Sequence, residues 1–165
     1  MNISENFTLK EFLQSETANK NGFLEQYSPS ETVIHNVTLL SQKVAERIRA
    51  KFGSFTPTCA YRCDRTNDKV GGSKYSKHKT GQAFDETFIL NGKNISDKVF
   101  YWLLKSDVEW TKIIWEYGDN DNPNWLHIEY VEGAKKEVYY IFKKGVYVPY
   151  LGSVLEKYHK VNRKY

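Results

Sequence analysis

The chain has 165 residues, of which 40% are hydrophobic and 27% charged, so it is long enough to bury one core and we expect a single domain over residues 1–165. The mean hydropathy is -0.64 and no run approaches the roughly 20 apolar residues of a membrane span, which excludes an integral membrane protein and predicts no membrane partner. The net charge of +4 would favour any polyanion, whether nucleic acid or an anionic cell wall, without selecting one.

The N-terminal residues and the cysteines indicate the cellular compartment in which the protein is made. The first ten residues, MNISENFTLK, lack the basic region and apolar core of a secretory signal, so we expect the protein to be made in a cytoplasm. Cys59 and Cys63 are the two cysteines, and their C-x-x-x-C spacing fits neither a disulfide framework nor a zinc ribbon. Two reduced thiols are the expected state, with a bridge between them as the alternative.

Capping signals predict two helices in the first third of the chain. Thr8 and Glu11 fit a capping box, which predicts a short helix from Leu9 to about Ala18. Ser28 and Glu31 repeat the signal, with Pro29 at the first helical position. An apolar stripe at three- and four-residue steps then predicts one long helix that ends at Phe52, before Gly53; its members are Val33, Val37, Leu40, Val44 and Ile48.

After residue 53 the pattern changes to alternating and aromatic segments typical of strands. Strands are expected at 55–62, 82–90, 112–117, 125–130 and 137–142, with a polar loop at 63–80 and a helix capped by Ser96 that extends through Leu104. Helices first and strands later predict an α+β fold in which N-terminal helices pack on a mainly antiparallel sheet. The last eleven residues, LEKYHKVNRKY, fit either a short basic helix or a loose tail.

Two histidines and an aspartate have the residue types of a metal site. His78 lies in a glycine-flanked loop, Asp85 follows on the strand expected next, and His127 lies on a later strand. A catalytic zinc site uses three His, Asp or Glu ligands and leaves one position open for water. If the two strands are neighbours, these three residues supply that set. The alternative for each histidine is a buried, hydrogen-bonded side chain without a metal.

The string SKHKTGQAFD, from Ser76 to Asp85, and the later WLH resemble a known signature. The pattern S-x-H-x-x-G-x-A-x-D followed by W-x-H is similar to that of the M15 metallopeptidases, the group of D-Ala-D-Ala carboxypeptidases and L-Ala-D-Glu endopeptidases. The upstream segment with Tyr61, Arg62, Asn67 and VGGS is similar to the same family's G-Y-R, N and V-G-G-S segment, and the opening NFTLKEFLQSETA is similar to the start of small phage-encoded members. The resemblance implies a hedgehog or D-Ala-D-Ala peptidase-like fold and a zinc ion bound by His78, Asp85 and His127.

The resemblance also implies roles for two residues near the expected ligands. Arg62 matches the family arginine that stabilises developing negative charge or holds the substrate, and its planar fork suits an oxyanion or a carboxylate. A surface ion pair is the alternative for this arginine. Ser76 matches a position that hydrogen-bonds substrate, although a serine that caps the loop would look the same.

One position departs from the family pattern. Peptide-hydrolysing members usually carry a carboxylate three residues before the second histidine, as the general base, and here that residue is Asn124. An amide cannot accept a proton, and general-base assistance contributes about 10² to 10⁴-fold in rate. Glu116 in the segment IIWEYG is the preferred substitute, because EYG recurs in small phage-type members, and a structural ion pair is the alternative for this residue. The other candidates are Asp119, Asp121 and Glu129.

The leading hypothesis is therefore a zinc peptidase that cleaves peptide bonds in peptidoglycan, as a carboxypeptidase or endopeptidase in a bacterium or as a phage endolysin. It would act at the bacterial cell wall or be carried in a virion. The alternative is a virion-associated or wall-binding protein, in contact with virion proteins, that keeps the metal fold with weak or lost catalysis. A basic nucleic-acid-binding domain is a third possibility, which the zinc ligands do not favour, so no specific nucleic acid is expected. His35 and His159 are expected to be solvated.

Overall fold

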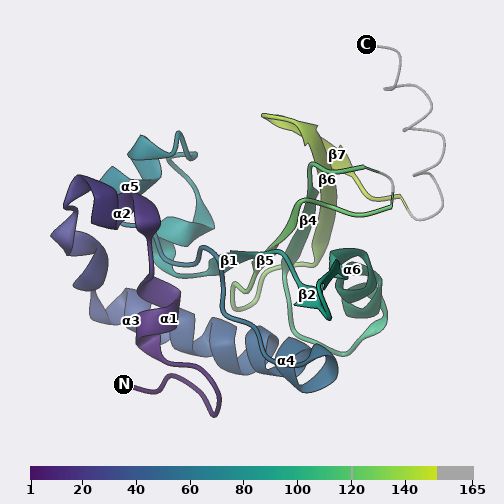
Figure 1. The fold of residues 1–165 in the computed structure, drawn as a ribbon, viewed down its shortest axis with the longest axis horizontal. Helices are drawn as coiled ribbons and strands as arrows, with labels where there is room; N and C mark the ends of the chain where they lie inside the picture. The colour runs from purple at the N-terminus through teal and green to yellow at the C-terminus, as the bar shows by residue number, and fades with distance from the viewer. Residues whose placement is uncertain (120, 152–165) are drawn as a thin grey trace.

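The computed structural model describes residues 1–119 and 121–151, and it has the α+β fold that the sequence predicts (Figure 1). The helical segments are α1 (Leu9–Leu13), α2 (Glu16–Asn21), the 3-10 turn η1 (Leu24–Tyr27), α3 (Glu31–Leu40), the π-helical η2 (Ser41–Ala45), α4 (Glu46–Phe52), α5 (Asp64–Lys69), the 3-10 turn η3 (Lys77–Thr80) and α6 (Ser96–Lys105). The strands are β1 (Ala83–Glu86), β2 (Ile89–Leu90), β3 (Lys93–Asn94), β4 (Lys112–Glu116), β5 (Trp125–Glu129), β6 (Glu137–Lys143) and β7 (Val146–Pro149). None of these helices has the length and apolar character needed to span a bilayer.

The first predicted helix is divided in two. The carboxylate of Glu11 accepts the backbone N–H of Thr8 at 2.7 Å, as expected at the start of α1. The expectation of one helix to about Ala18 is wrong, because α1 ends at Leu13 and α2 begins at Glu16. The Ser15 hydroxyl caps α2 by accepting the Ala18 N–H at 3.1 Å, so a second helix start interrupts the first.

The long helix is confirmed as α3, η2 and α4 in continuous succession, and all five predicted stripe residues are buried. It ends before Gly53, whose φ of 96° suits a residue without a side chain. Its start differs from the prediction, because Ser30 is the N-cap and accepts the Val33 N–H at 3.4 Å. Pro29 therefore precedes the cap and does not occupy the first helical position.

The prediction for residues 55–80 is wrong. The expected strand at 55–62 makes only an isolated antiparallel bridge, between Cys59 and Asp85. The next backbone groups turn to other partners, since the N–H of Tyr61 donates to Phe12 and that of Arg62 donates to His78. The expected loop at 63–80 contains the helical segments α5 and η3. Both cysteines are free thiols, as expected.

The five-stranded sheet has the order β1-β5-β4-β6-β7, with every pair antiparallel except β4 and β6. Three expected strands are confirmed as β4, β5 and β6, whereas the expected strand at 82–90 divides into β1 and β2 and the edge strand β7 was not predicted. Ser96 is not a cap as predicted: it is the first residue of α6, and its hydroxyl accepts the Phe88 N–H. The C-terminal stretch from residue 152, with His159, lies outside the described residues.

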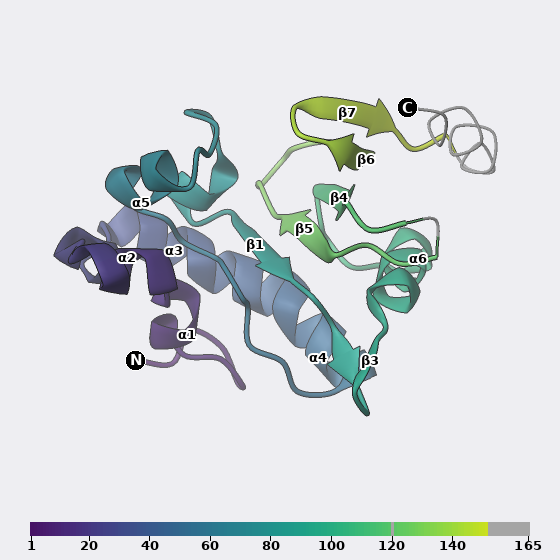
Figure 2. The ribbon, with the colours of Figure 1, turned by 45° about the horizontal axis from the view of Figure 1, so that its top comes forward.

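The helices cover one face of the sheet. Alternate residues of β1, β4 and β5 are buried there in a single apolar cluster with the long helix and α6; they are Phe84, Ile113, Trp115, Leu126 and Ile128. In Figures 1 and 2 the α5 side of the molecule and the β6–β7 hairpin project beyond the opposite face. The remaining residues of the same strands belong to that opposite face and carry the polar groups described next.

Candidate metal centre

The strand register brings the three predicted ligands together. Asp85 on β1 pairs directly with His127 on β5, so both side chains point to the same face. His78 enters from the adjacent turn η3. Its Nε2 lies 3.1 Å from His127 Nδ1 and 3.2 Å from Asp85 Oδ2, and His127 Nδ1 lies 2.8 Å from Asp85 Oδ1. Two imidazole nitrogens and the carboxylate of Asp85, from three elements, therefore converge on one point.

These donor atoms fit a tetrahedral zinc ion. Ligands bound at about 2.0–2.1 Å in such a site lie roughly 3.3 Å from one another, close to the observed separations of 2.8 to 3.2 Å. Two imidazole nitrogens and one carboxylate are also the donor set of catalytic zinc sites with an open fourth position. The three side chains line a cleft of about 720 Å³, so that position is accessible to a substrate.

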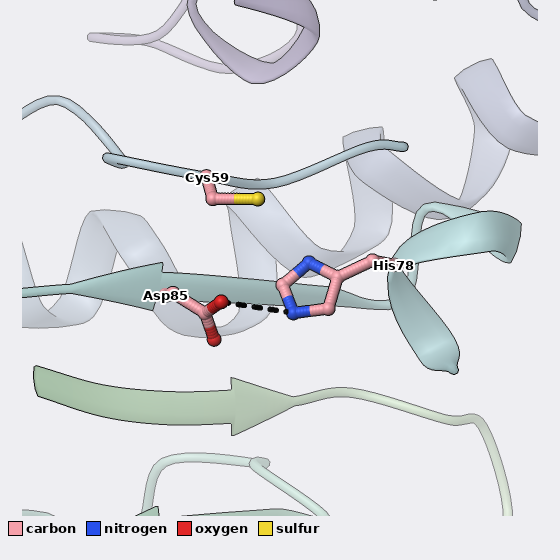
Figure 3. A group of neighbouring side chains, drawn as sticks. All are labelled: Cys59, His78 and Asp85. Atoms are coloured by element: carbon pink, nitrogen blue, oxygen red, sulfur yellow. Dashed lines mark ion pairs between the residues drawn. The ribbon is translucent and has the colours of Figure 1, made fainter. Parts of the chain in front are cut away.

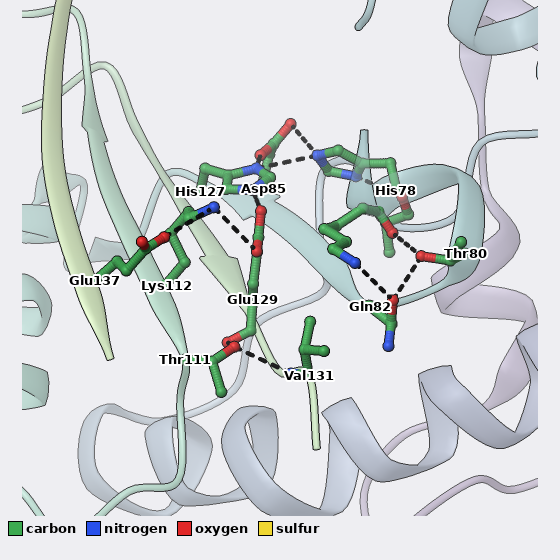
Figure 4. A network of polar contacts seen from close by, with 12 residues as sticks. His78, Thr80, Gln82, Asp85, Thr111, Lys112, His127, Glu129, Val131 and Glu137 are labelled. Carbon is green, nitrogen blue, oxygen red and sulfur yellow. Dashed lines mark hydrogen bonds and ion pairs between the residues drawn. The ribbon is translucent and has the colours of Figure 1, made fainter. Parts of the chain in front are cut away.

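Each histidine is oriented through its other nitrogen, as metal-binding histidines are. His78 Nδ1 donates to the carbonyl oxygen of Ala60 at 2.6 Å, and His127 Nε2 donates to Glu129 Oε1 at 3.0 Å. Lys112 holds Glu129 in turn, at 3.7 Å, and also pairs with Glu137 at 3.3 Å (Figure 4). The contacts leave His78 Nε2 and His127 Nδ1 directed at the common point.

The electrostatics of the cluster favour a cation at that point. Burial disfavours the charge of Asp85, but the two neighbouring imidazoles outweigh burial and hold the pKa of Asp85 well below its usual range. Burial lowers the pKa of His78. Burial acts in the same direction on His127, but the carboxylates of Asp85 and Glu129 outweigh it and raise the pKa of His127 to about 10. An ionised carboxylate and a strongly basic imidazole thus face the site.

Glu116 lies beside the cluster and Asn124 does not. A carboxylate oxygen of Glu116 is within 4.8 Å of the donor atoms of Asp85 and His127, and the side chain lines the cleft. Burial, with a contribution from the charge of Asp85, raises the pKa of Glu116 to about 7. Asn124 is exposed, is not among the residues that line the cleft, and uses its backbone N–H and carbonyl to bond Glu116 and Thr87.

The other candidate bases have different surroundings. Asp119 and Asp121 do not line the cleft, and Asp119 Oδ1 accepts the backbone N–H groups of Asp121 and Asn122 within its own turn. Glu129 lines the cleft but is hydrogen-bonded to His127. Among the carboxylates predicted from the sequence, Glu116 is therefore the one that lines the cleft and is not hydrogen-bonded to a histidine.

Arg62 and Ser76 both line the same cleft. Arg62 Nε is buried without a hydrogen-bond partner, and no carboxylate in residues 1–119 or 121–151 forms an ion pair with this arginine. The Ser76 hydroxyl makes no capping bond to η3. The alternatives of a surface ion pair and a loop-capping serine therefore find no support in the described part of the chain.

Cys59 forms a second potential ligand group with His78 and Asp85 (Figure 3). This thiol does not line the cleft, and burial raises the pKa of Cys59 to about 12. His78 Nδ1 already donates to Ala60. The group that faces the cleft is therefore His78, Asp85 and His127.

No role was predicted from the sequence for several cleft residues, among them Lys112, Lys144 and Tyr147. Lys112 shares a strand with Glu116 at a separation of four, so alternation along β4 could have identified it. Lys144 and Tyr147 belong to the β6–β7 hairpin, whose second strand the sequence did not reveal.

Two imidazoles and a carboxylate that converge in an open cleft, with another carboxylate beside them, are the arrangement of a metal-dependent hydrolase. The sequence matches the family described as Peptidase M15 over residues 5–129, which is more than half of the chain. The chain therefore belongs to the M15 peptidase family, whose members are hydrolases and generally depend on zinc. No match was found among curated proteins.

Proposed function

We propose that the protein is a zinc-dependent peptidase of the bacterial cell wall that hydrolyses peptide bonds involving D-amino acids in peptidoglycan stem peptides or cross-links. The observation that carries the proposal is the convergence of His78, Asp85 and His127 on one point of an open cleft. The resemblance of the sequence to D-Ala-D-Ala carboxypeptidases and L-Ala-D-Glu endopeptidases supports the substrate class. We also infer a fold of the hedgehog or D-Ala-D-Ala peptidase type and an origin as a phage endolysin-like protein.

The residues of the cleft have different roles in the proposed hydrolysis. Zinc, when bound by the three ligands, polarises the scissile carbonyl and acidifies a water molecule. Glu116 accepts the proton of the attacking water and returns it to the leaving amine, for which a pKa of about 7 is well matched. Arg62 stabilises the negative charge that develops on the carbonyl oxygen, and the Ser76 hydroxyl hydrogen-bonds the substrate backbone.

The second candidate function is a virion-associated or wall-binding protein with weak or absent catalysis. It is favoured by Asn124, which stands where family members usually carry the base. The proximity of Glu116 to Asp85 and His127 argues for the peptidase instead. The two functions differ in whether bound zinc is accompanied by hydrolysis.

The test is mass spectrometry of purified peptidoglycan after incubation with the zinc-loaded protein. A chelator-treated sample and His127→Ala serve as controls. New fragments with the zinc-loaded wild type alone would support the peptidase and identify the bond. Stoichiometric zinc without fragments would contradict it and favour the binding protein, and Asn124→Glu would then be tested for gain of hydrolysis.

A further inference from the structure

The β6–β7 hairpin forms a wall of the cleft and lies beyond the residues that match the M15 family. We propose that Lys144 of this hairpin anchors a carboxylate of the substrate, so that the cleft selects peptides with a free carboxylate over neutral ones. This inference rests on the proposed peptidase function and adds a specificity-determining residue to it.

The hairpin continues the face of the sheet that carries the metal ligands. Glu116 on β4 pairs with Ile141 on β6, and Ile141 pairs with Tyr147 on β7, so the three side chains form one row across the sheet. All three line the cleft. Burial raises the pKa of Tyr147, and the charge of Glu116 adds to the effect, which places the phenol in the electrostatic field of the candidate base. A substrate beside Glu116 therefore also lies beside the hairpin.

Lys144 reaches from the hairpin to the opposite rim of the cleft. Its Nζ lies 3.2 Å from the position that a Cβ atom would take at Gly71. Gly71 has a φ of +67° and belongs to the turn between α5 and η3. The ammonium group thus lies at the mouth of the cleft, between the hairpin and this turn.

Among the cleft lysines of the described residues, Lys144 differs from Lys112 and Lys77 in having neither a hydrogen-bond partner nor an ion-pair partner. Lys112 forms ion pairs with Glu129 and Glu137, and Lys77 donates to Gln82. Within residues 1–119 and 121–151, no carboxylate lies within ion-pair distance of Lys144. An ammonium without a partner at the mouth of a cleft attracts an anionic ligand group, and the natural partner in a peptide is a carboxylate.

Exposed apolar side chains occur in both segments that flank Lys144, the hairpin and the segment at residues 70–75. Val70 and Tyr75 are exposed on one side, and Val146 and Tyr147 are exposed on the hairpin, with 78% of Tyr75 and 55% of Tyr147 accessible. Exposed apolar side chains on both rims of a cleft are typical of a ligand site. The matching ligand is a peptide with apolar side chains that ends in a carboxylate.

The experiment compares a D-Ala-D-Ala-terminated peptide with its C-terminal amide on zinc-loaded protein. We expect Lys144→Gln to raise KM for the free acid about three- to tenfold, the range of an accessible charge-assisted contact, and to leave KM for the amide within about twofold. Lys143→Gln is the matched control, because Lys143 is exposed on the same hairpin and does not line the cleft. Lys144→Arg should retain much of the preference.

Equal changes in KM for the two peptides, no change for either, or the same effect in Lys143→Gln would overturn the inference. If the wild type cleaves neither peptide, the proposed function fails for this substrate. Calorimetric binding of the acid and the amide to the same variants without metal then tests Lys144 separately. A Kd that does not distinguish acid from amide in the wild type would overturn the role of Lys144.

Discussion

The two faces of the sheet are built from alternate residues of the same strands and have opposite properties. On β5, Leu126 and Ile128 are completely buried against the helices, whereas Trp125, His127 and Glu129 line the cleft. The period of two along a strand allows five residues to supply both a core and a site. Substitutions one position apart on the same strand should therefore affect stability and catalysis separately.

The largest expected effect belongs to Glu116 on the cleft face. Glu116→Gln removes the proton acceptor, and we expect kcat to fall about 10² to 10⁴-fold while bound zinc and the free energy of unfolding change little. Glu137→Gln is the control, since Glu137 belongs to the same face but does not line the cleft. Steady-state kinetics and metal analysis measure the effect. Unchanged hydrolysis in Glu116→Gln would reject Glu116 as the base.

On the core face we expect the reverse: a substitution should lower stability and leave kcat nearly unchanged. Ile113 on β4 is completely buried, and Ile113→Ala should lower the free energy of unfolding by about 2–5 kcal/mol through lost burial and a cavity. Urea denaturation measures this loss, and kcat at low temperature should stay within about threefold. Ile89→Ala is the control, because Ile89 is 56% exposed and should change stability by less than about 0.5 kcal/mol. A large loss of kcat in folded Ile113→Ala would argue against separate faces.

A smaller effect, on zinc affinity, is expected for Glu129, which lies on the cleft face and orients the metal ligand His127. Glu129→Ala removes the carboxylate that accepts the hydrogen bond from His127 Nε2, and we expect zinc affinity to fall about 10- to 100-fold. Glu129→Gln should lose less, since its amide oxygen can still accept this hydrogen bond. Competition with a zinc chelator measures the affinities. Glu132→Ala, at an exposed position, should match the wild type, and an equal loss there would contradict the assignment.

The smallest effect concerns Glu86, an acid on the core face. Burial raises the pKa of Glu86 to about 7, although its carboxylate accepts the N–H and hydroxyl of Thr58. The folded state therefore binds this proton more tightly than the unfolded state, so the stability of metal-free protein should fall as pH rises from about 4.5 to 7. Glu86→Gln should remove this contribution, so its stability relative to the wild type should rise by about 1–3 kcal/mol between pH 5 and pH 8, as measured by denaturation. Identical pH profiles would contradict the burial of a carboxylate there.

The sequence predicted the elements whose hydrophobic periodicity is visible over a few residues, namely the long helix and strands β4 and β5. The stripe of the long helix and the alternation of β4 and β5 are short-range signals, and both are present in the structure. Residues 55–62 have the composition of a strand, but their backbone groups bond to separate segments such as Phe12 and His78, which no local signal reports. The short edge strand β7 has only four residues and was missed for the same reason.

In the candidate site, too, the sequence did not reveal the residues whose position depends on contacts between distant segments. The types and spacing of His78, Asp85 and His127 indicated a ligand set, and the antiparallel pairing of β1 and β5 explains why the set assembles. Lys144 could not be found in this way, because its place in the cleft depends on the path of the hairpin toward the turn at Gly71. Long-range pairing therefore decides which polar residues share a site.

The most direct test of the account is the zinc stoichiometry of the purified protein, measured by native mass spectrometry for the wild type and for Asp85→Asn. We predict one zinc ion per wild-type chain and less than about one tenth of that occupancy in the variant, which loses the carboxylate charge between the two histidines. A wild type that binds no zinc, or a variant that binds as much as the wild type, would contradict the assignment of His78, Asp85 and His127 as a metal centre.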